Sequence, residues 1–169
     1  RKLVFAAAHD HRGIDPEVEG LFAGRTLPIN GESLAGFVAM TGQWVNLSDA
    51  TQPPPGAPFR VDHSFEAEGG FRFRSILAVP LRLPDGLAVG VLELFNRLDV
   101  NGEIVPFPDE ARDALLSLSS TAAVTIHNAM LQDQLRQAHR ETILRLSVAS
   151  EYRDDDTGEL FVVMEKLEG

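Results

Sequence analysis

The chain has 169 residues, of which 44% are hydrophobic, and this length is enough to bury the core of one domain with an appendage. Its formal net charge of −10 would repel a phosphate backbone or an anionic lipid surface, so nucleic-acid and membrane partners are disfavoured. The absence of cysteine excludes disulfides, thiolate metal sites and a catalytic thiolate.

Short strand and helix signals alternate in the first 60 residues. Residues 2–9 read KLVFAAAH, an apolar run that ends at a polar loop, which predicts a strand. Ser33 is suited to cap a helical turn that Gly42 would end. Residues 44–47 are a brief strand candidate, and the prolines in 48–59 predict a loop because they remove hydrogen-bond donors.

The middle of the chain predicts an antiparallel hairpin. Residues 75–83 and 86–97 are two apolar, strand-like runs joined by a Pro-Asp-Gly turn. Pro80 lies inside the first run, so we expect this strand to lie at a sheet edge or to bulge at that point.

A long helix is predicted from Pro108 onward, where about forty residues contain neither Gly nor Pro. Apolar residues at spacings of three and four in its first half predict a face covered by a sheet or partner helix: Leu115, Leu118, Ala122, Ile126 and Ala129. A narrower stripe follows at Leu131, Leu135, Ala138 and Thr142. It predicts pairing with a second copy, and hence a homodimer through this helix.

No apolar stretch approaches the roughly 18 residues that a membrane span needs, and the N-terminal residues are too short and too polar-flanked for a secretion signal. We therefore expect a cytoplasmic protein.

Three segments together resemble a GAF domain within residues 1–131. They are LPINGESLAGFVAMTGQWVNLSDA, FRFRSILAVPLRLPDGLAVGVLELFNR and FPDEARDALLSLSSTAAVTIHNAML, which begin at residues 27, 71 and 107. The resemblance implies an α+β fold, in which helices flank an antiparallel sheet and a long C-terminal helix follows. It also implies a small-molecule pocket over one sheet face and a sensory or regulatory role.

Residues 141–159, ETILRLSVASEYRDDDTGE, are similar to the opening segment of the bacterial HD-GYP domain, which cleaves cyclic di-GMP. We therefore expect a helical linker at 132–153, and at 154–169 a junction and strand candidate before a catalytic part that is absent here. Phosphodiester cleavage by metal ions needs several His and Asp ligands, and no His follows Asp154, Asp155 and Asp156. We expect this cluster to be a solvated loop, and we assign no catalytic or metal-binding residues.

The resemblance nominates two sets of residues. The pocket candidates are aromatic residues that could stack on a ring and polar residues that could accept hydrogen bonds: Trp44, Asp49, Phe59, Asp62, Phe65, Phe71 and Ser75. The second set partly matches the Asn-Lys-Phe-Asp-Glu motif of GAF domains that bind cyclic nucleotides: Asn96, Arg97, Phe107, Asp109 and Glu110. We expect a structural Arg97–Asp109 ion pair, with a ligand contact as the alternative.

Three histidines are weaker candidates. His63 lies on the loop that would cover the pocket; a solvated ring is the expectation, and haem ligation the alternative that the resemblance raises. His9 and His11 share one side of an extended segment, but the sequence nominates no third metal ligand.

Two hypotheses about function follow. The first is a sensor whose ligand, a small molecule or a cyclic nucleotide, biases a cyclic di-GMP phosphodiesterase through the C-terminal helix. The second is a ligand-free dimerisation and signal-transmission module whose pocket is filled by its own aromatic residues. A ligand can shift the helix only by its preference for one of two states, so the two hypotheses differ in what must bind. We expect no enzymatic activity from this chain itself, and the sequence identifies no cofactor.

Overall fold

The computed structural model describes residues 2–5, 20, 24–63, 66 and 72–153, with side chains as far as residue 147. The chain divides into two compact units, residues 1–126 and 127–169. In the first unit, β1 (Lys2–Val4) and β2 (Thr26–Pro28) form a two-stranded antiparallel sheet. The strands β3 (Val45–Leu47), β4 (Ile76–Arg82) and β5 (Ala88–Phe95) form a second antiparallel sheet in the order β3-β4-β5.

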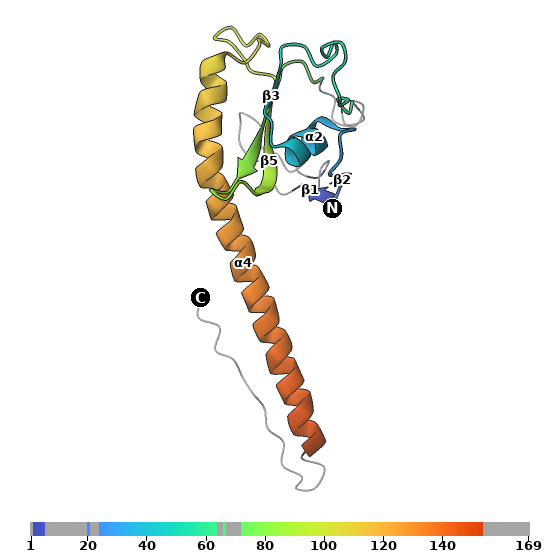
Figure 1. The fold of residues 1–169 in the computed structure, drawn as a ribbon, viewed down its shortest axis with the longest axis vertical. Helices are drawn as coiled ribbons and strands as arrows, with labels where there is room; N and C mark the ends of the chain where they lie inside the picture. Colours follow the sequence, from blue (N-terminus) through green and yellow to red (C-terminus); the bar gives the residue numbers. More distant parts are fainter. Residues whose placement is uncertain (1, 6–19, 21–23, 64–65, 67–71, 154–169) are drawn as a thin grey trace. The chain divides into compact units, whose positions relative to one another are not determined.

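Two helices accompany these sheets, α2 (Leu34–Thr41) and the long α4 (Asp109–Arg153) (Figure 1). The predicted α+β fold, with an antiparallel sheet, flanking helices and a long C-terminal helix, is confirmed. Of the strand predicted at residues 2–9, the structure describes β1 and Phe5, and the remainder lies outside the described residues.

Local signals fix both ends of α2, as predicted. The Ser33 hydroxyl oxygen accepts the Gly36 N–H at 3.0 Å, which satisfies a donor that the first turn of the helix leaves open. Gly42 follows the helix at φ 68°, where a side chain would be strained, and its N–H donates to the Val38 carbonyl at 2.8 Å.

The hairpin of β4 and β5 also forms where it was predicted. Its register pairs Ile76 with Phe95 and Pro80 with Val91, and a register shift follows between Leu81 and Arg82. Pro80 lies beyond Ala78, the last residue of β4 that pairs with β3. Proline is tolerated there because β3 begins at Val45, opposite Ala78, and does not extend far enough to pair with Pro80.

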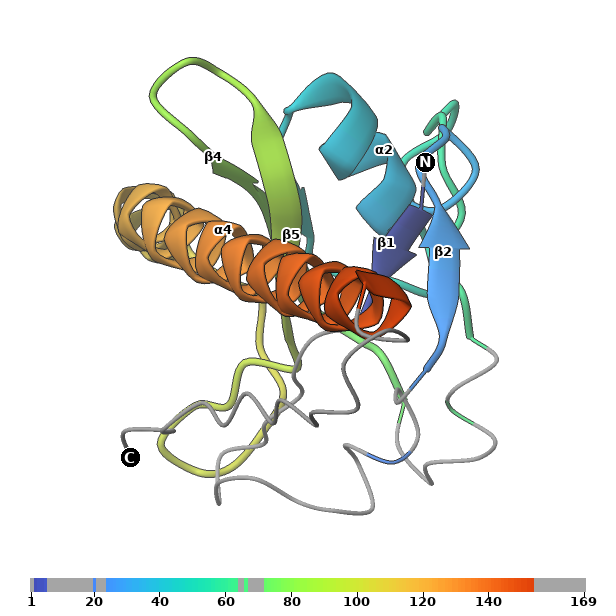
Figure 2. The same cartoon turned by 90° about the horizontal axis from the view of Figure 1, so that it is seen from below.

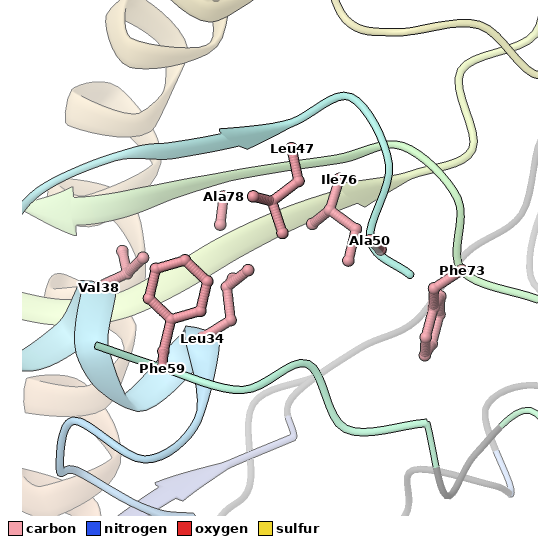
Figure 3. Packing of buried hydrophobic residues seen from close by; sticks show 8 residues of the cluster. All are labelled: Leu34, Val38, Leu47, Ala50, Phe59, Phe73, Ile76 and Ala78. Carbon is pink, nitrogen blue, oxygen red and sulfur yellow. The ribbon is translucent and has the colours of Figure 1, made fainter. Parts of the chain in front are cut away.

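The two faces of β4 pack against different helices, and the two views of the fold agree on this arrangement (Figures 1 and 2). Ile76 and Ala78 point toward α2, into a cluster with Leu34, Val38, Leu47, Ala50, Phe59 and Phe73 (Figure 3). Leu77 and Val79 point the other way, into a cluster with Phe107 and Leu115. This alternation follows from the two-residue period of a strand.

The buried face of α4 differs from the predicted stripe. Leu115, Ser119 and Ala123 are buried, whereas Leu118 and Ile126 are 65% and 41% exposed. The buried row therefore advances by four residues at a time and includes a serine, whose hydroxyl donates to the Leu116 carbonyl at 2.8 Å. The sheet thus covers Leu115 of the predicted stripe but not Leu118 or Ile126, and cover of these two by a partner helix stays a prediction.

The prediction that no segment could span a membrane also needs correction. The described part of α4, Asp109–Ser147, contains an 18-residue window of mean hydropathy 1.2, which is sufficient by length and composition to cross a membrane. Leu115, Ser119 and Ala123 of this helix are buried, but only 17% of the window is buried. One such helix, judged by length and composition alone, is weak evidence for a membrane span.

The second unit is described as helix up to Arg153, and most of its described side chains are exposed. Leu131 is 44% exposed and Leu135 is 71% exposed. Two ion pairs along its surface, Asp133–Arg136 and Glu141–Arg145, are solvent-accessible and contribute little to stability.

Candidate ligand-binding site and its anchoring network

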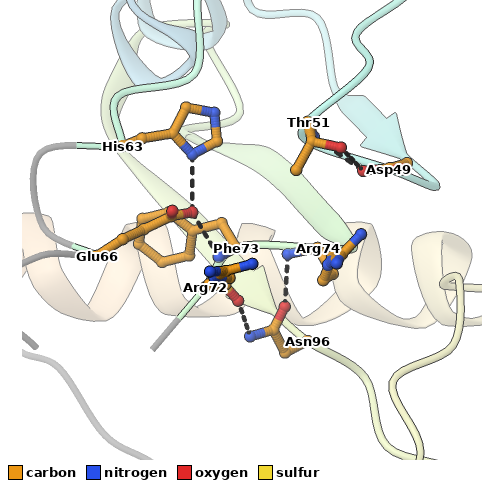
Figure 4. A network of polar contacts seen from close by, with 8 residues as sticks. All are labelled: Asp49, Thr51, His63, Glu66, Arg72, Phe73, Arg74 and Asn96. Atoms are coloured by element: carbon orange, nitrogen blue, oxygen red, sulfur yellow. Dashed lines mark hydrogen bonds and ion pairs between the residues drawn. The ribbon is translucent and has the colours of Figure 1, made fainter. Parts of the chain in front are cut away.

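Asn96 directly follows β5, and its side chain hydrogen-bonds to the segment that precedes β4 (Figure 4). Its side-chain amide donates to the Arg72 carbonyl at 2.7 Å, and its side-chain oxygen accepts the Arg74 N–H at 2.7 Å. The backbone of Asn96 is left-handed, with φ 53°, a conformation that asparagine tolerates better than most residues. This residue was predicted to be structural, and the structure places it as a clamp between two strand ends.

Glu66 forms a second anchor on the same side of the sheet. One of its carboxylate oxygens lies 2.7 Å from His63 Nδ1 and accepts the Phe73 N–H at 2.8 Å (Figure 4). The His63 hydrogen bond, the Phe73 N–H and the nearby Arg72 charge together lower the pKa of Glu66, against a smaller opposing effect of burial. His63 is exposed, as a solvated ring would be, and it is also bonded to Glu66.

Phe73 links this polar network to the core. Its ring is buried and lies 4.5 Å, centroid to centroid, from the ring of Phe95 at the end of β5. The Glu66 and Asn96 hydrogen bonds to the backbone on either side of Phe73 thus hold one aromatic wall in place.

Glu93 is the most unusual group near this wall, and the sequence analysis missed it. It pairs with Ala78 across the sheet and shares a face with Val91, which packs against the cluster beneath α2. Burial raises the pKa of its carboxyl group to about 7, and within the described part of the chain this group makes no hydrogen bond or ion pair. The signal was a single acid in the otherwise apolar strand AVGVLELF.

The predicted pocket residues do not all come together. Phe59 packs in the cluster between the sheet and α2, with its ring 5.2 Å from that of Phe37. Trp44 instead lies on the α4 side of the sheet, where the Arg112 guanidinium of α4 stacks 4.8 Å from the Trp44 ring centroid. Residues 44 and 46 alternate with Val45, which packs under α2, so the strand period accounts for this placement.

The remaining pocket candidates have mixed positions. Ser75 is buried, and its hydroxyl oxygen accepts the Arg97 N–H at 3.2 Å. Asp49 accepts the backbone N–H and the hydroxyl of Thr51, which lowers the pKa of the Asp49 carboxyl. Asp62 is exposed. Phe65 and Phe71 lie outside the described residues.

The predicted Arg97–Asp109 ion pair does not form. The Arg97 guanidinium donates to the Pro106 carbonyl at 3.1 Å, whereas Asp109 pairs with Arg112 at 3.0 Å. Asp109 and Arg112 are three residues apart on one helix, and this spacing brings their side chains together without any loop closure. Asp109 and Glu110 also place negative charge at the positive N-terminal end of α4.

Phe107 is buried against Leu77 and Leu115, and its carbonyl accepts the Asn46 side-chain amide at 3.0 Å. The motif residues thus connect β5, the loop before α4 and the start of α4. No group of three or more His, Asp or Glu residues in the described ranges could hold a metal ion. His9, His11 and the three aspartates at 154–156 fall outside those ranges.

Residues 3–126 match the family model of the GAF domain. The chain belongs to the GAF domain family. The "Dual 3',5'-cyclic-AMP and -GMP phosphodiesterase 11A" of Takifugu rubripes is 31% identical over 118 residues, which are 70% of this chain and 12% of that protein. Phosphodiesterase 11 of Drosophila melanogaster, described by the same dual activity, is 28% identical over 119 residues, or 69% of this chain and 8% of that protein.

This GAF domain therefore spans about one-tenth of the length of these curated relatives. Among solved structures, the GAF domain of a phosphoenolpyruvate-protein phosphotransferase from Coxiella burnetii superposes with a TM-score of 0.51 at 22% identity. That match covers 66% of this chain and 58% of the other, and it supports the fold alone. The match to the GAF family supports a regulatory, sensing role for this domain.

Proposed function

We propose that this GAF domain senses a small molecule that binds over the α2 side of the sheet and hydrogen-bonds to Glu93. A half-buried carboxylate without a partner is costly, because it loses its hydration and gains no compensating bond. A ligand that brings an N–H or O–H donor to this position would remove that cost. The unpartnered Glu93 is the single observation that carries the proposal.

A cyclic nucleotide is the ligand class that we test first. Its exocyclic amino group and ribose hydroxyl, and in cyclic GMP also the ring N1–H, offer donors to a carboxylate. Its flat base can stack on an aromatic wall such as Phe73 and Phe95. The names of the relatives support this choice, because both describe phosphodiesterases of cyclic AMP and cyclic GMP. For this chain, binding of a cyclic nucleotide is a proposal.

The first experiment is a native mass spectrum of the purified domain, followed by calorimetric titration with cyclic AMP and cyclic GMP. We expect a saturable complex with one of them, weakened at least tenfold in Glu93→Gln, which keeps the shape of the side chain but loses its charge. Glu103→Gln, in an exposed turn, is the matched control. If Glu93→Gln and the wild type bind the nucleotide with equal affinity, Glu93 is not part of the binding site. If neither nucleotide binds at millimolar concentration, the ligand is not a cyclic nucleotide.

We further propose that the signal leaves through α4 in a homodimer. Leu131 and Leu135 are four residues apart on the helix and are exposed, and a second copy of the helix would cover them. Leu135→Glu should shift a dimer toward monomer in analytical ultracentrifugation. Gln137→Glu adds the same charge away from the stripe and should leave the dimer intact; equal dissociation by both variants would argue against this interface.

The output that we propose is a cyclic di-GMP phosphodiesterase. Its support is the similarity of residues 141–159 to the opening of an HD-GYP domain, with a helical linker over 132–153 and a junction over 154–169. The test is hydrolysis of cyclic di-GMP by the longest natural form of the protein, with and without the sensed ligand. A natural protein that carries no HD-GYP region would rule this output out without affecting ligand binding.

A ligand-free transmission module is the alternative, and the packing under α2 favours it. Phe59 is buried against Leu34, Val38 and Phe37, so aromatic side chains already fill part of the space between helix and sheet. If the domain is a dimer that binds neither nucleotide and carries no mass beyond its own, this alternative replaces the sensor.

A further inference from the structure

A second concave site lies at the opposite end of the β4–β5 hairpin from the Asn96 clamp. It is a cleft of about 410 Å³ between β1, the end of α2 and the turn that joins β4 to β5. Lys2 and Leu3 line it from β1, Met40 from α2, and Arg82 and Leu87 from the hairpin. Its volume falls within the range of about 300–1,000 Å³ that is typical of small-molecule sites.

The charge of this cleft opposes the charge of the chain. The protein carries 25 acidic residues against 15 lysines and arginines, yet the described residues that line the cleft include Lys2 and Arg82 and no carboxylate. Asp85, the acid of the hairpin turn, is not part of the lining, and it accepts the Leu87 N–H at 2.9 Å. A concave surface with two cations in an anionic protein attracts a small anion, because its local potential is positive.

Arg82 is held in position before any ligand arrives. Its Nε donates to the Gly86 carbonyl at 3.2 Å, and its Nη1 lies 3.5 Å from the Gly42 carbonyl. The second contact also places a cation beside the C-terminal end of α2, whose partial negative charge would otherwise disfavour an anion. A guanidinium that is already fixed loses little freedom when it binds a carboxylate.

The remaining lining is largely apolar and partly uncovered. Met40 is 55% exposed and Leu87 is 51% exposed, although both are large apolar side chains that gain by being covered. Ile29 and Leu3, both half-buried, extend the same lining. An anion alone would leave this surface in water, so the lining suits a ligand with an apolar body attached to its charged group.

We propose that this cleft binds a small organic anion with an apolar body, and that a medium-chain carboxylate is the simplest member of this class. The carboxylate would lie between Arg82 and Lys2, and the alkyl chain would cover Met40 and Leu87. The site shares no residue with the Glu93 site, so either can fail without the other.

The test is titration of the ¹⁵N-labelled domain with octanoate, followed by amide chemical shifts. We expect saturable shifts of the Gly42, Gly86 and Leu87 amides at millimolar octanoate or below. Octylammonium has the same chain and the opposite charge, and it should not shift these amides. Shifts of equal size with both compounds, or octanoate shifts confined to α4, would overturn the proposal.

Two variants test whether Arg82 and Lys2 bind the carboxylate. Arg82→Gln should weaken octanoate at least tenfold, whereas Arg140→Gln, an exposed α4 arginine, should leave the affinity unchanged. Because Arg82 also bonds two carbonyls, Lys2→Gln provides an independent measurement at the exposed end of β1, and we expect a loss of at least threefold. Unchanged affinity in Lys2→Gln and in a folded Arg82→Gln would show that the cleft does not select anions.

Discussion

The two faces of the central sheet are built from the same strands but differ in chemistry. The face toward α4 joins Leu77, Val79, Phe107 and Leu115 in an apolar cluster. Its buried polar groups are uncharged: Ser119, and the Asn46 amide that donates to the Phe107 carbonyl. The face toward α2 has a comparable apolar cluster, but it also carries the Glu93 carboxyl beside Ala78 and ends in the Asn96 and Glu66 hydrogen bonds. The two faces therefore differ in that the α2 side carries an ionisable group, Glu93, within its apolar surroundings.

The difference arises from single residues and not from a change in architecture. Leu77 and Ala78 are neighbours on β4, yet they belong to opposite clusters because strand side chains alternate. On β5, Leu92 and Glu93 alternate in the same way, so one face receives a leucine and the other an acid.

The largest expected effect comes from the closed face. Leu77→Ala should lower the free energy of unfolding by about 3 kcal/mol, because the side chain is fully buried and its loss leaves a cavity among well-packed neighbours. Urea unfolding of the wild type and the variant measures the difference. Leu87→Ala, at an exposed leucine of the hairpin turn, is the control and should change stability by less than about 1 kcal/mol.

Glu93→Gln tests the open face through its pH dependence. The ordinary pKa of the carboxyl group is 4.5, and burial raises it to about 7, so the folded protein holds this proton more tightly than the unfolded chain does. The associated stability is fully present below pH 4.5 and is lost as the pH rises to about 7. The loss amounts to at most about 3 kcal/mol.

Glutamine cannot ionise, so Glu93→Gln should abolish this loss and make the domain more stable than the wild type above pH 7. Chemical denaturation at several pH values between 4 and 8 measures it. If the two proteins keep the same pH dependence, the Glu93 carboxyl is not held in a protonated state by the fold.

Asn96 should have a smaller effect, which can be divided into two parts. Asn96→Ala removes the side-chain bonds to Arg72 and Arg74 and also strains a left-handed backbone, for a loss of about 2 kcal/mol. Asn96→Gly removes the same bonds but tolerates the backbone conformation, so its loss should be smaller. Thermal unfolding of both variants separates the loss due to the hydrogen bonds from the loss due to backbone strain. A glycine variant less stable than the alanine variant would contradict this expectation.

Local chemistry explains which parts of the fold the sequence predicted. The helix cap at Ser33, the stop at Gly42 and the Pro-Asp-Gly turn of the hairpin depend on interactions between residues close in sequence, and all three formed as expected. The α+β class was implied by the resemblance to the GAF family, and these local elements agree with it.

Predictions that depended on which side of an element faces the core were less successful. Trp44 was expected at the pocket, but strand alternation places it against Arg112, and Arg112 also provides the partner that Asp109 was expected to find in Arg97. Glu93 was missed because its significance depends on the face that β5 turns toward α2. Periodicity shows that two faces exist, but not which helix covers each one.

The smallest expected effect, at Glu66, has the opposite pH sign to that of Glu93. The His63 hydrogen bond lowers the pKa of Glu66 below its ordinary 4.5, so the associated stability is present above pH 4.5 and is lost as the pH falls through the lowered pKa. The pair is partly solvent-accessible, and we expect Glu66→Gln to cost less than about 1 kcal/mol at pH 7. Denaturation between pH 3 and 8 should show a weaker acid loss in this variant and an unchanged fall between pH 4.5 and 7. A variant that instead removes the fall between pH 4.5 and 7 would assign that titration to Glu66, and the contrast between the two carboxylates would no longer hold.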